Sequence, residues 1–322
     1  MRTQPPVRPE PRTRTLAAPP SLTPLLARGA LLSPLKRPRP DASAPATRLA
    51  LSGVRVDLAH LATYERVCGF ATGADALPVT YPHVLAFPLA MRIMAGRAFP
   101  LPLLGLVHTS IEITRYEETA ATSEYELGVQ VEKLAPHRRG TQATVLTEAR
   151  AHGELVWESR STYLARHRPR DRNPGQDENR GQDEDRVRDP QHAPPADPAT
   201  TPAAPSPEGP KPLPAVADWC LARDVGRRYG AVSGDRNPIH LHPLTARLFG
   251  FPRAIAHGMW TVARCLAEYG PRQSVRVRAE FRAPVLLPGT VTYAARGSSF
   301  ELRSGDRVHL TGDVRPQGPR GA

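Results

Sequence analysis

The sequence has few cysteines and no long apolar segment. Its three cysteines, Cys68, Cys220 and Cys265, form no Cys-x-x-Cys pair and no cluster with metal-ligand spacing. This argues against a disulfide framework and a cysteine-ligated metal, and it predicts a protein of the reducing cytoplasm. The longest apolar runs, VLAFPLAM and FPLPLLGLV, contain proline and are shorter than the roughly 18 residues of a membrane-spanning helix. We therefore expect no membrane span.

Acidic residues are outnumbered by basic ones, which gives a net charge of +12 and an isoelectric point near 10.3. A basic surface attracts phosphates, so nucleic acid is one partner to consider. However, the sequence has no RNP aromatic motif, zinc finger or basic helix, and much of its arginine lies in segments that also carry Asp and Glu. We therefore expect no nucleic-acid partner.

The 322 residues suffice for two domains of roughly 100 to 150 residues each. Residues 1–48 are rich in proline, arginine and alanine and are predicted to form a flexible arm with one docking helix. Residues 166–212 contain no Ile, Leu, Met, Phe, Tyr or Trp. Ordering them would cost backbone entropy without burying apolar surface, so they are predicted to form a disordered linker. The folded domains are then 49–165 and 213–317, followed by a tail at 318–322.

Each folded domain begins with helical patterns and ends with alternating apolar and polar residues, as half-buried antiparallel strands do. This order is an α+β pattern. The first domain has predicted helices at 57–70 and 81–96 and predicted strands at 106–118, 123–134, 141–152 and 154–166. The second has predicted helices at 216–230 and 258–269 and predicted strands at 274–285, 289–297, 299–305 and 306–314. The repeated order indicates a duplication.

Three polar residues fall within six positions of the second domain: Asp235, Asn237 and His240. Gly234 and Pro238 cannot belong to one regular helix with them, so we expect a bent loop that brings the carboxylate and the imidazole together. The first domain has FATGADALPVT at the corresponding place and lacks these residues. The paired acid and imidazole predict an acid–base site in the second domain alone.

Farther along the chain, His257 and Gly258 precede an apolar helical pattern. Gly258 therefore lies near a helix N-terminus, where backbone N–H groups are unpaired and the helix dipole favours negative charge. This predicts a donor for an oxyanion.

These residues resemble the MaoC-like, R-specific enoyl-CoA hydratases (hydratase 2) and the related acyl-thioester dehydratases. The family motif is Gly-Asp-x-Asn-Pro-hydrophobic-His followed later by His-Gly, and it is filled by Gly234, Asp235, Asn237, Pro238, Ile239, His240, His257 and Gly258. The resemblance covers about 49–165 and 213–317. It implies a double hot-dog fold, in which two antiparallel sheets each wrap a central helix, with a degenerate N-terminal and a catalytic C-terminal repeat.

The resemblance also implies site roles. Asp235 and His240 would be the catalytic pair, Asn237 would support them, and the Gly258 amide would receive the thioester oxygen with His257 beside it. In hydration, His240 would deprotonate water while Asp235 supplies the C2 proton. No metal or cofactor is expected, because coenzyme A or the phosphopantetheine of an acyl carrier protein is part of the substrate.

Several alternatives stay open from the sequence. Arg276 and Arg278 either contact coenzyme A phosphates or form a solvated strand face. The protein is a homodimer or a monomer that mimics one. An inactive acyl-thioester-binding partner subunit and a hot-dog thioesterase are the competing functions. The retained Asp235, Asn237 and His240 argue against the first, and thioesterases of this fold lack this loop. His83 and His108 are expected to be packed structural residues.

Overall fold

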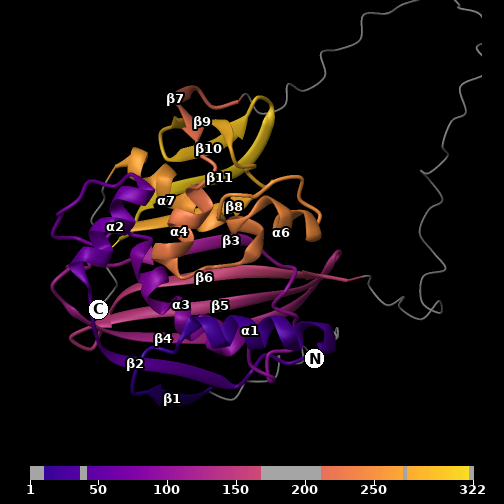
Figure 1. Ribbon diagram of the computed structural model, residues 1–322. Coiled ribbons are helices and arrows are strands. Elements are labelled where there is room, and N and C mark those ends of the chain that lie inside the picture. Colours follow the sequence, from indigo (N-terminus) through magenta and orange to yellow (C-terminus); the bar gives the residue numbers. More distant parts are fainter. Residues whose placement is uncertain (1–10, 37–41, 168–211, 271–273, 319–322) are drawn as a thin grey trace, which may run out of the picture. The chain divides into compact units, whose positions relative to one another are not determined.

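The computed structural model describes residues 11–36, 42–167, 212–270 and 274–318. Its strands are β1 (Arg12–Leu16), β2 (Thr47–Arg55), β3 (Leu106–Arg115), β4 (Glu124–His137), β5 (Gly140–Ala151), β6 (Glu154–Arg166), β7 (Ala215–Leu221), β8 (Val275–Phe281), β9 (Gly289–Arg296), β10 (Ser299–Ser304) and β11 (Arg307–Pro316). Within the described residues they form one sheet in the order β1-β2-β4-β5-β6-β3-β8-β11-β10-β9-β7 (Figure 1).

The first repeat places two helices before its long strands. Helix α2 (Leu58–Cys68) begins where the Asp57 carboxylate accepts hydrogen bonds from the backbone N–H groups of Ala59 and His60, and it ends at Gly69 in the left-handed conformation. Helix α3 (Tyr81–Met94) is buried along almost its whole length despite Pro88. An all-round apolar helix of this kind needs a sheet around it, and β2 to β6 supply one.

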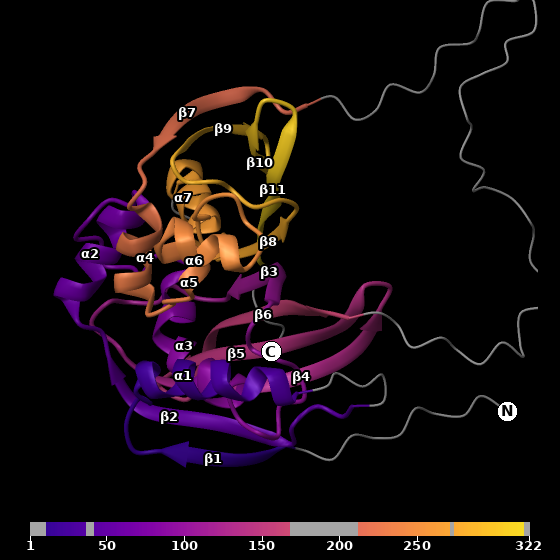
Figure 2. The same ribbon diagram turned by 45° about the vertical axis from the view of Figure 1, so that its right-hand side comes forward.

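The second repeat has the same order with a longer helical connection. It contains α4 (Val225–Ser233), α5 (Pro238–Leu241), α6 (Pro243–Leu248) and α7 (Gly258–Tyr269). Helix α7 lies inside the curve of β7 to β11 (Figure 2). Like α2, helix α4 ends at a left-handed glycine, Gly234. The double hot-dog fold is therefore present, with α3 and α7 as its two central helices.

The helix predicted at 216–230 is wrong in its first half, because β7 occupies residues 215–221. The Trp219 ring stacks on Tyr293 at 5.3 Å between centroids, and the two residues lie on the paired strands β7 and β9. Helix α4 begins only after the turn that ends at Asp224. Cross-strand pairing with a segment more than 60 residues away thus overrode the local helical pattern.

The two repeats join through the antiparallel pair of β3 and β8, in which Ile113 lies opposite Val277 and Ser110 opposite Glu280. This pairing continues the sheet from one repeat into the other. One chain therefore reproduces the arrangement of two associated hot-dog units.

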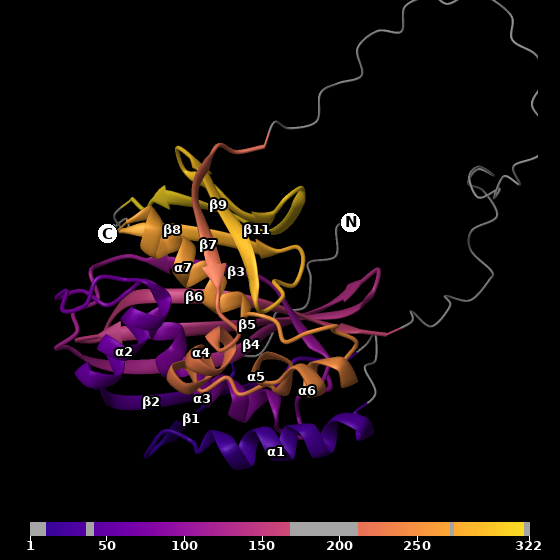
Figure 3. The ribbon, with the colours of Figure 1, turned by 45° about the horizontal axis from the view of Figure 1, so that its top comes forward.

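Part of the arm predicted as flexible belongs to the fold. β1 pairs in parallel with β2, and α1 (Leu22–Leu32), which is followed by the short η1 (Ser33–Leu35), contacts α3 (Figure 3). Leu22, Leu25 and Leu26 pack against the core, which supplies the apolar burial that orders this segment. The rest of the arm at 1–10 and 37–41, the linker at 168–211 and residues 319–322 of the tail lie outside the described residues.

Candidate functional site

The segment after α4 is bent by its own side chains. The Ser233 hydroxyl accepts a hydrogen bond from the Asp235 N–H at 3.2 Å, and Asp235 Oδ1 accepts one from the Asn237 N–H at 3.2 Å. Asn237 Oδ1 in turn caps α5 by accepting from the Ile239 N–H at 3.4 Å. Asp235 and Asn237 thus lie in the predicted bend, whereas His240 lies on the one-turn helix α5 rather than in a loop.

His240 is held in one tautomer by the backbone. Its Nδ1 donates to the carbonyl oxygen of Ile255 at 2.8 Å, so the neutral ring carries its lone pair on Nε2. Burial lowers the pKa of His240, and the nearby Asp235 carboxylate opposes part of that shift. Near neutral pH the residue is therefore an uncharged imidazole with a free acceptor nitrogen.

His257 supports the same place from the other side. Its Nε2 donates to the backbone carbonyl of Asp235 at 2.8 Å, and its ring stacks on His240 at 3.7 Å between centroids. Burial, with a smaller contribution from His240, keeps the pKa of His257 well below its ordinary value. His257 therefore fixes the backbone that carries the carboxylate and the orientation of the His240 ring.

The structure brings Asp235, His240 and His257 together as the sequence led us to expect for the first two. One nitrogen or oxygen from each side chain lies within 4.8 Å of the others. The Asp235 side chain is 33% exposed while His257 is only 2% exposed, so the carboxylate is the group that an incoming molecule meets. This spacing could also hold a cation, and the absence of a metal stays a prediction.

Gly258 is the first residue of α7, directly after the N-cap His257. A Cβ atom at this position would lie 2.8 Å from Cε1 of Phe281, so the ring of Phe281 covers the glycine closely. An N–H group in the first turn of a helix has no partner within the helix. Gly258 thus presents a backbone donor beside an aromatic wall.

Two glycines on α4 allow the segment that carries Asp235 and His240 to pack closely against this helix. A Cβ at Gly226 would lie 2.0 Å from the His240 carbonyl oxygen, and one at Gly230 would lie 2.9 Å from the Asp235 carbonyl oxygen. Their spacing of four residues puts them on one face of the helix. This Gly-x-x-x-Gly spacing is a sequence signal beyond the predicted site residues, and it marks a helix face open to close backbone contact.

The first repeat contributes three further rings near the site, on α3, β3 and β6. Between ring centroids, His108 lies 4.5 Å from Tyr163, on which it stacks, and 4.9 Å from Phe281. The His83 ring lies 6.4 Å from the His108 ring. The Asp235 carboxylate acts electrostatically on both His83 and Tyr163. His83 and Tyr163 are far from Asp235 in the sequence, so only the folded structure shows that they lie near it.

Acid is expected to destabilise the protein through these buried imidazoles. Burial lowers the pKa of His83 to about 4 and that of His108 to about 3. Unfolded histidines take up protons near pH 6.5, whereas these two buried rings stay neutral to lower pH. The free energy of unfolding is therefore undiminished by them above about pH 6.5 and falls as the pH drops towards about 4 and 3. We expect urea unfolding to give a lower free energy at about pH 5 than at about pH 7.5.

Replacing His108 with Gln is expected to weaken this pH dependence, because one buried titrating group is removed. The matched control is His152→Asn at an exposed turn position, where Asn tolerates the left-handed backbone. An equal pH slope in wild type and His108→Gln would show that His108 does not contribute.

Arg276 and Arg278 do not join this cluster. Both lie on the exposed face of β8, and their Nε atoms share the carboxylate of Glu112 on β3 at 3.0 and 2.8 Å. They connect the two repeats across the strand pair. The solvated strand face, the alternative considered from the sequence, matches this placement.

The comparisons with known proteins agree with this geometry. The family model described as "MaoC like domain" matches residues 206–311. The chain is also 34% identical over 286 residues, which cover 86% of it and 92% of the relative, to an enzyme of Mycobacterium tuberculosis. The chain therefore belongs to the MaoC-like dehydratase family.

That relative is the 3-hydroxyacyl-thioester dehydratase X of Mycobacterium tuberculosis. A crystal structure of HtdX from the same organism matches with a TM-score of 0.66 at 30% identity, over 84% of this chain and 100% of that chain. A MaoC-like dehydratase from Phytophthora capsici matches with a TM-score of 0.58 at 15% identity, over 86% and 97%, and shares the fold alone. Among the described residues, no helix is long and apolar enough to cross a membrane.

Proposed function

We propose that this protein is a (3R)-hydroxyacyl thioester dehydratase, a hydro-lyase that also hydrates 2-enoyl thioesters in the reverse direction. The observation that carries the proposal is the His240 tautomer. Its Nδ1 is occupied by the Ile255 carbonyl, which leaves Nε2 as a proton acceptor beside the Asp235 carboxyl group. The related enzyme named as a 3-hydroxyacyl-thioester dehydratase supports the substrate class.

In the hydration direction, His240 Nε2 takes a proton from water as the water oxygen bonds to C3. Asp235 begins this direction as the carboxylic acid and supplies its proton to C2, so that the double bond becomes a single bond and Asp235 is left as the carboxylate. The next turnover requires the proton on His240 to return to Asp235. One side-chain nitrogen or oxygen of each lies within 4.8 Å of the other, a separation that one bridging water spans. Groups in these acid–base roles typically accelerate a reaction about 10² to 10⁴-fold.

The negative charge that develops on the thioester oxygen during the reaction requires a hydrogen-bond donor. We assign this role to the Gly258 N–H at the start of α7, where the helix dipole would add to the stabilisation. Asn237 holds the bend through its backbone bond to Asp235 and its cap on α5, so its role is to position the other two residues.

We further propose that the acyl group arrives on coenzyme A or on an acyl carrier protein, and that no separate cofactor takes part. The basic surface of this chain suits the phosphates of either carrier. Arg276 and Arg278 share one Glu112 carboxylate, which leaves one positive charge over, so their contact with the carrier phosphates stays a prediction. The pairing of β3 with β8 supports a monomer that mimics a dimer of single hot-dog units.

The test is a panel of 2-enoyl-CoA substrates of increasing chain length. Hydration is monitored by the absorbance of the substrate, and the configuration of the 3-hydroxyacyl product is determined by chiral analysis. The proposal predicts (3R) product. Free thiol release without hydration would instead indicate a thioesterase. Binding without turnover of any chain length would indicate a partner subunit that has lost activity.

A further inference from the structure

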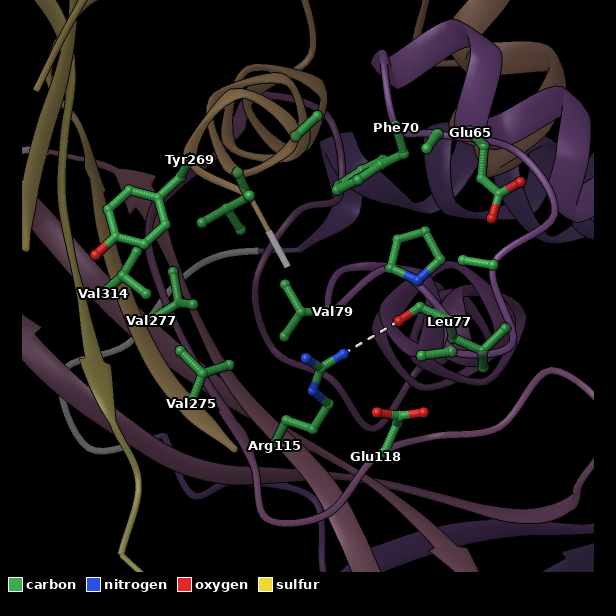
Figure 4. A pocket seen from close by; sticks show the side chains of 17 residues that line it. Glu65, Phe70, Leu77, Val79, Arg115, Glu118, Tyr269, Val275, Val277 and Val314 are labelled. Carbon is green, nitrogen blue, oxygen red and sulfur yellow. Dashed lines mark hydrogen bonds between the residues drawn. The ribbon is translucent and has the colours of Figure 1, made fainter. Parts of the chain in front are cut away.

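A pocket lies away from the Asp235 cluster, between the two repeats. Its volume is about 390 Å³, and its walls come from the segment before α3, the C-terminal end of α7 and strands β3, β8 and β11 (Figure 4). The walls are mainly apolar and include Leu77, Val79, Val275, Val277 and Val314. Small-molecule sites typically have volumes of roughly 300 to 1,000 Å³ and predominantly apolar linings.

Backbone hydrogen bonds show which part of the second repeat corresponds to this pocket. The Leu77 N–H donates to Thr119 at 2.8 Å, just as the Ala256 N–H donates to Val285 at 2.9 Å. The next residues correspond in order, so one repeat has Pro78 and Val79 where the other has His257 and Gly258.

The same correspondence holds at the strands and at the helix ends. The N–H groups of Tyr116 and Arg282 donate to Val156 and His309, at 2.9 and 2.8 Å. Arg115 therefore stands where the other repeat has Phe281.

The left-handed glycines that end α2 and α4, Gly69 and Gly234, give a third correspondence. Phe70 consequently stands where the second repeat has Asp235. The pocket is thus the counterpart of the catalytic site in the degenerate repeat.

The chemistry of the counterpart has changed while its cavity has remained. Phe70 offers no carboxylate, Pro78 no imidazole, and Val79 carries a side chain where the catalytic repeat has glycine. The loss of the carboxylate at Phe70 excludes the proposed acid–base reaction, and all three replacements extend the apolar lining.

We propose that this pocket is a second, non-catalytic site that binds the aliphatic chain of an acyl compound bearing one neutral hydroxyl or carbonyl group. The choice of acyl chemistry rests on the proposed function, because the pocket is derived from a site for acyl thioesters. The apolar lining and the polar groups inside it support the same class of ligand.

The polar groups favour a neutral head over an anion. The Glu65 side chain lines the pocket, and the residue is 1% exposed, with no hydrogen-bond partner for its Oε1 among the described residues. Arg115 donates to the Leu77 carbonyl at 3.2 Å, and the Glu118 carboxylate acts on its charge. A hydroxyl group on the ligand would satisfy Glu65, whereas a carboxylate would meet two acidic side chains.

The test uses 1-decanol with a diazirine at its far end, photolysed with the full chain and mapped by peptide analysis. We expect labelling within 65–79 and 266–277. Ala71→Trp at the exposed rim and Ala267→Phe inside the pocket should each lower this labelling about tenfold, which corresponds to roughly 1.4 kcal/mol of binding. Ala59→Trp, on the exposed side of α2, is the control and should label like wild type.

Two further measurements separate this proposal from the proposed function. Asp235→Asn should lose turnover but keep the labelling of 65–79 and 266–277. Ala71→Trp should lose that labelling but keep its turnover of crotonyl-CoA. Labelling confined to 229–260, or labelling of the pocket that neither pocket variant reduces, would overturn the second site even if the enzyme is active.

Discussion

Asp235→Asn and His240→Gln are each expected to lower kcat for crotonyl-CoA hydration by about 10² to 10⁴-fold, the usual contribution of a positioned acid or base. Asn cannot supply a proton to C2 as a carboxylic acid does. Gln has no nitrogen that can accept a proton from water. Since Asp235 is one-third exposed and His240 is replaced by a residue of similar size, the thermal unfolding midpoint should change little.

The matched control is His242→Asn. His242 is exposed and caps α6 by accepting from the Leu244 N–H at 3.2 Å, a role that Asn fills well. This variant should keep wild-type turnover. Ordinary activity in either Asp235→Asn or His240→Gln would remove that residue from the proposed mechanism.

Gly258→Pro is expected to lower kcat about 10² to 10³-fold relative to Gly258→Ala, as the loss of one oxyanion donor does in other enzymes. Proline removes the N–H group but is well tolerated as the first residue of a helix. His257 already has the extended backbone that a following proline requires, with φ −66° and ψ 137°.

Gly258→Ala is the control because it brings the same close contact with Phe281 while it keeps the N–H group. Any effect of crowding therefore appears in both variants, and the missing donor affects only one. Circular dichroism and unfolding midpoints should be similar for the two. If the two variants had equal kcat values, the Gly258 amide would not stabilise the thioester oxygen.

Local sequence was sufficient for the elements whose signals lie within a few residues. The cap at Asp57, the glycine that ends α4 and the alternation along β4 to β6 are all readable from short windows. The motif from Gly234 to His240 also contains its own bend, because Asp235 and Asn237 bond to backbone N–H groups two residues ahead. These features require no distant partner.

Contacts with residues distant in the sequence decided the features that local patterns do not specify. β7 is a strand because it pairs with β9, and α1 is ordered because its leucines meet the core. The free Nε2 of His240 depends on the carbonyl of Ile255, fifteen residues away. His83 and Tyr163 approach Asp235 only through the packing of one repeat on the other.

The sequence by itself therefore determined the family motif, the duplication and the bend that carries the acid and the imidazole. The tertiary structure decided the tautomer of His240, the rings around Asp235 and the pocket retained in the first repeat. The physical reason is range: capping and turn formation act between residues close in the chain. Packing and electrostatic contacts join groups whose separation along the chain carries no information about their distance in space.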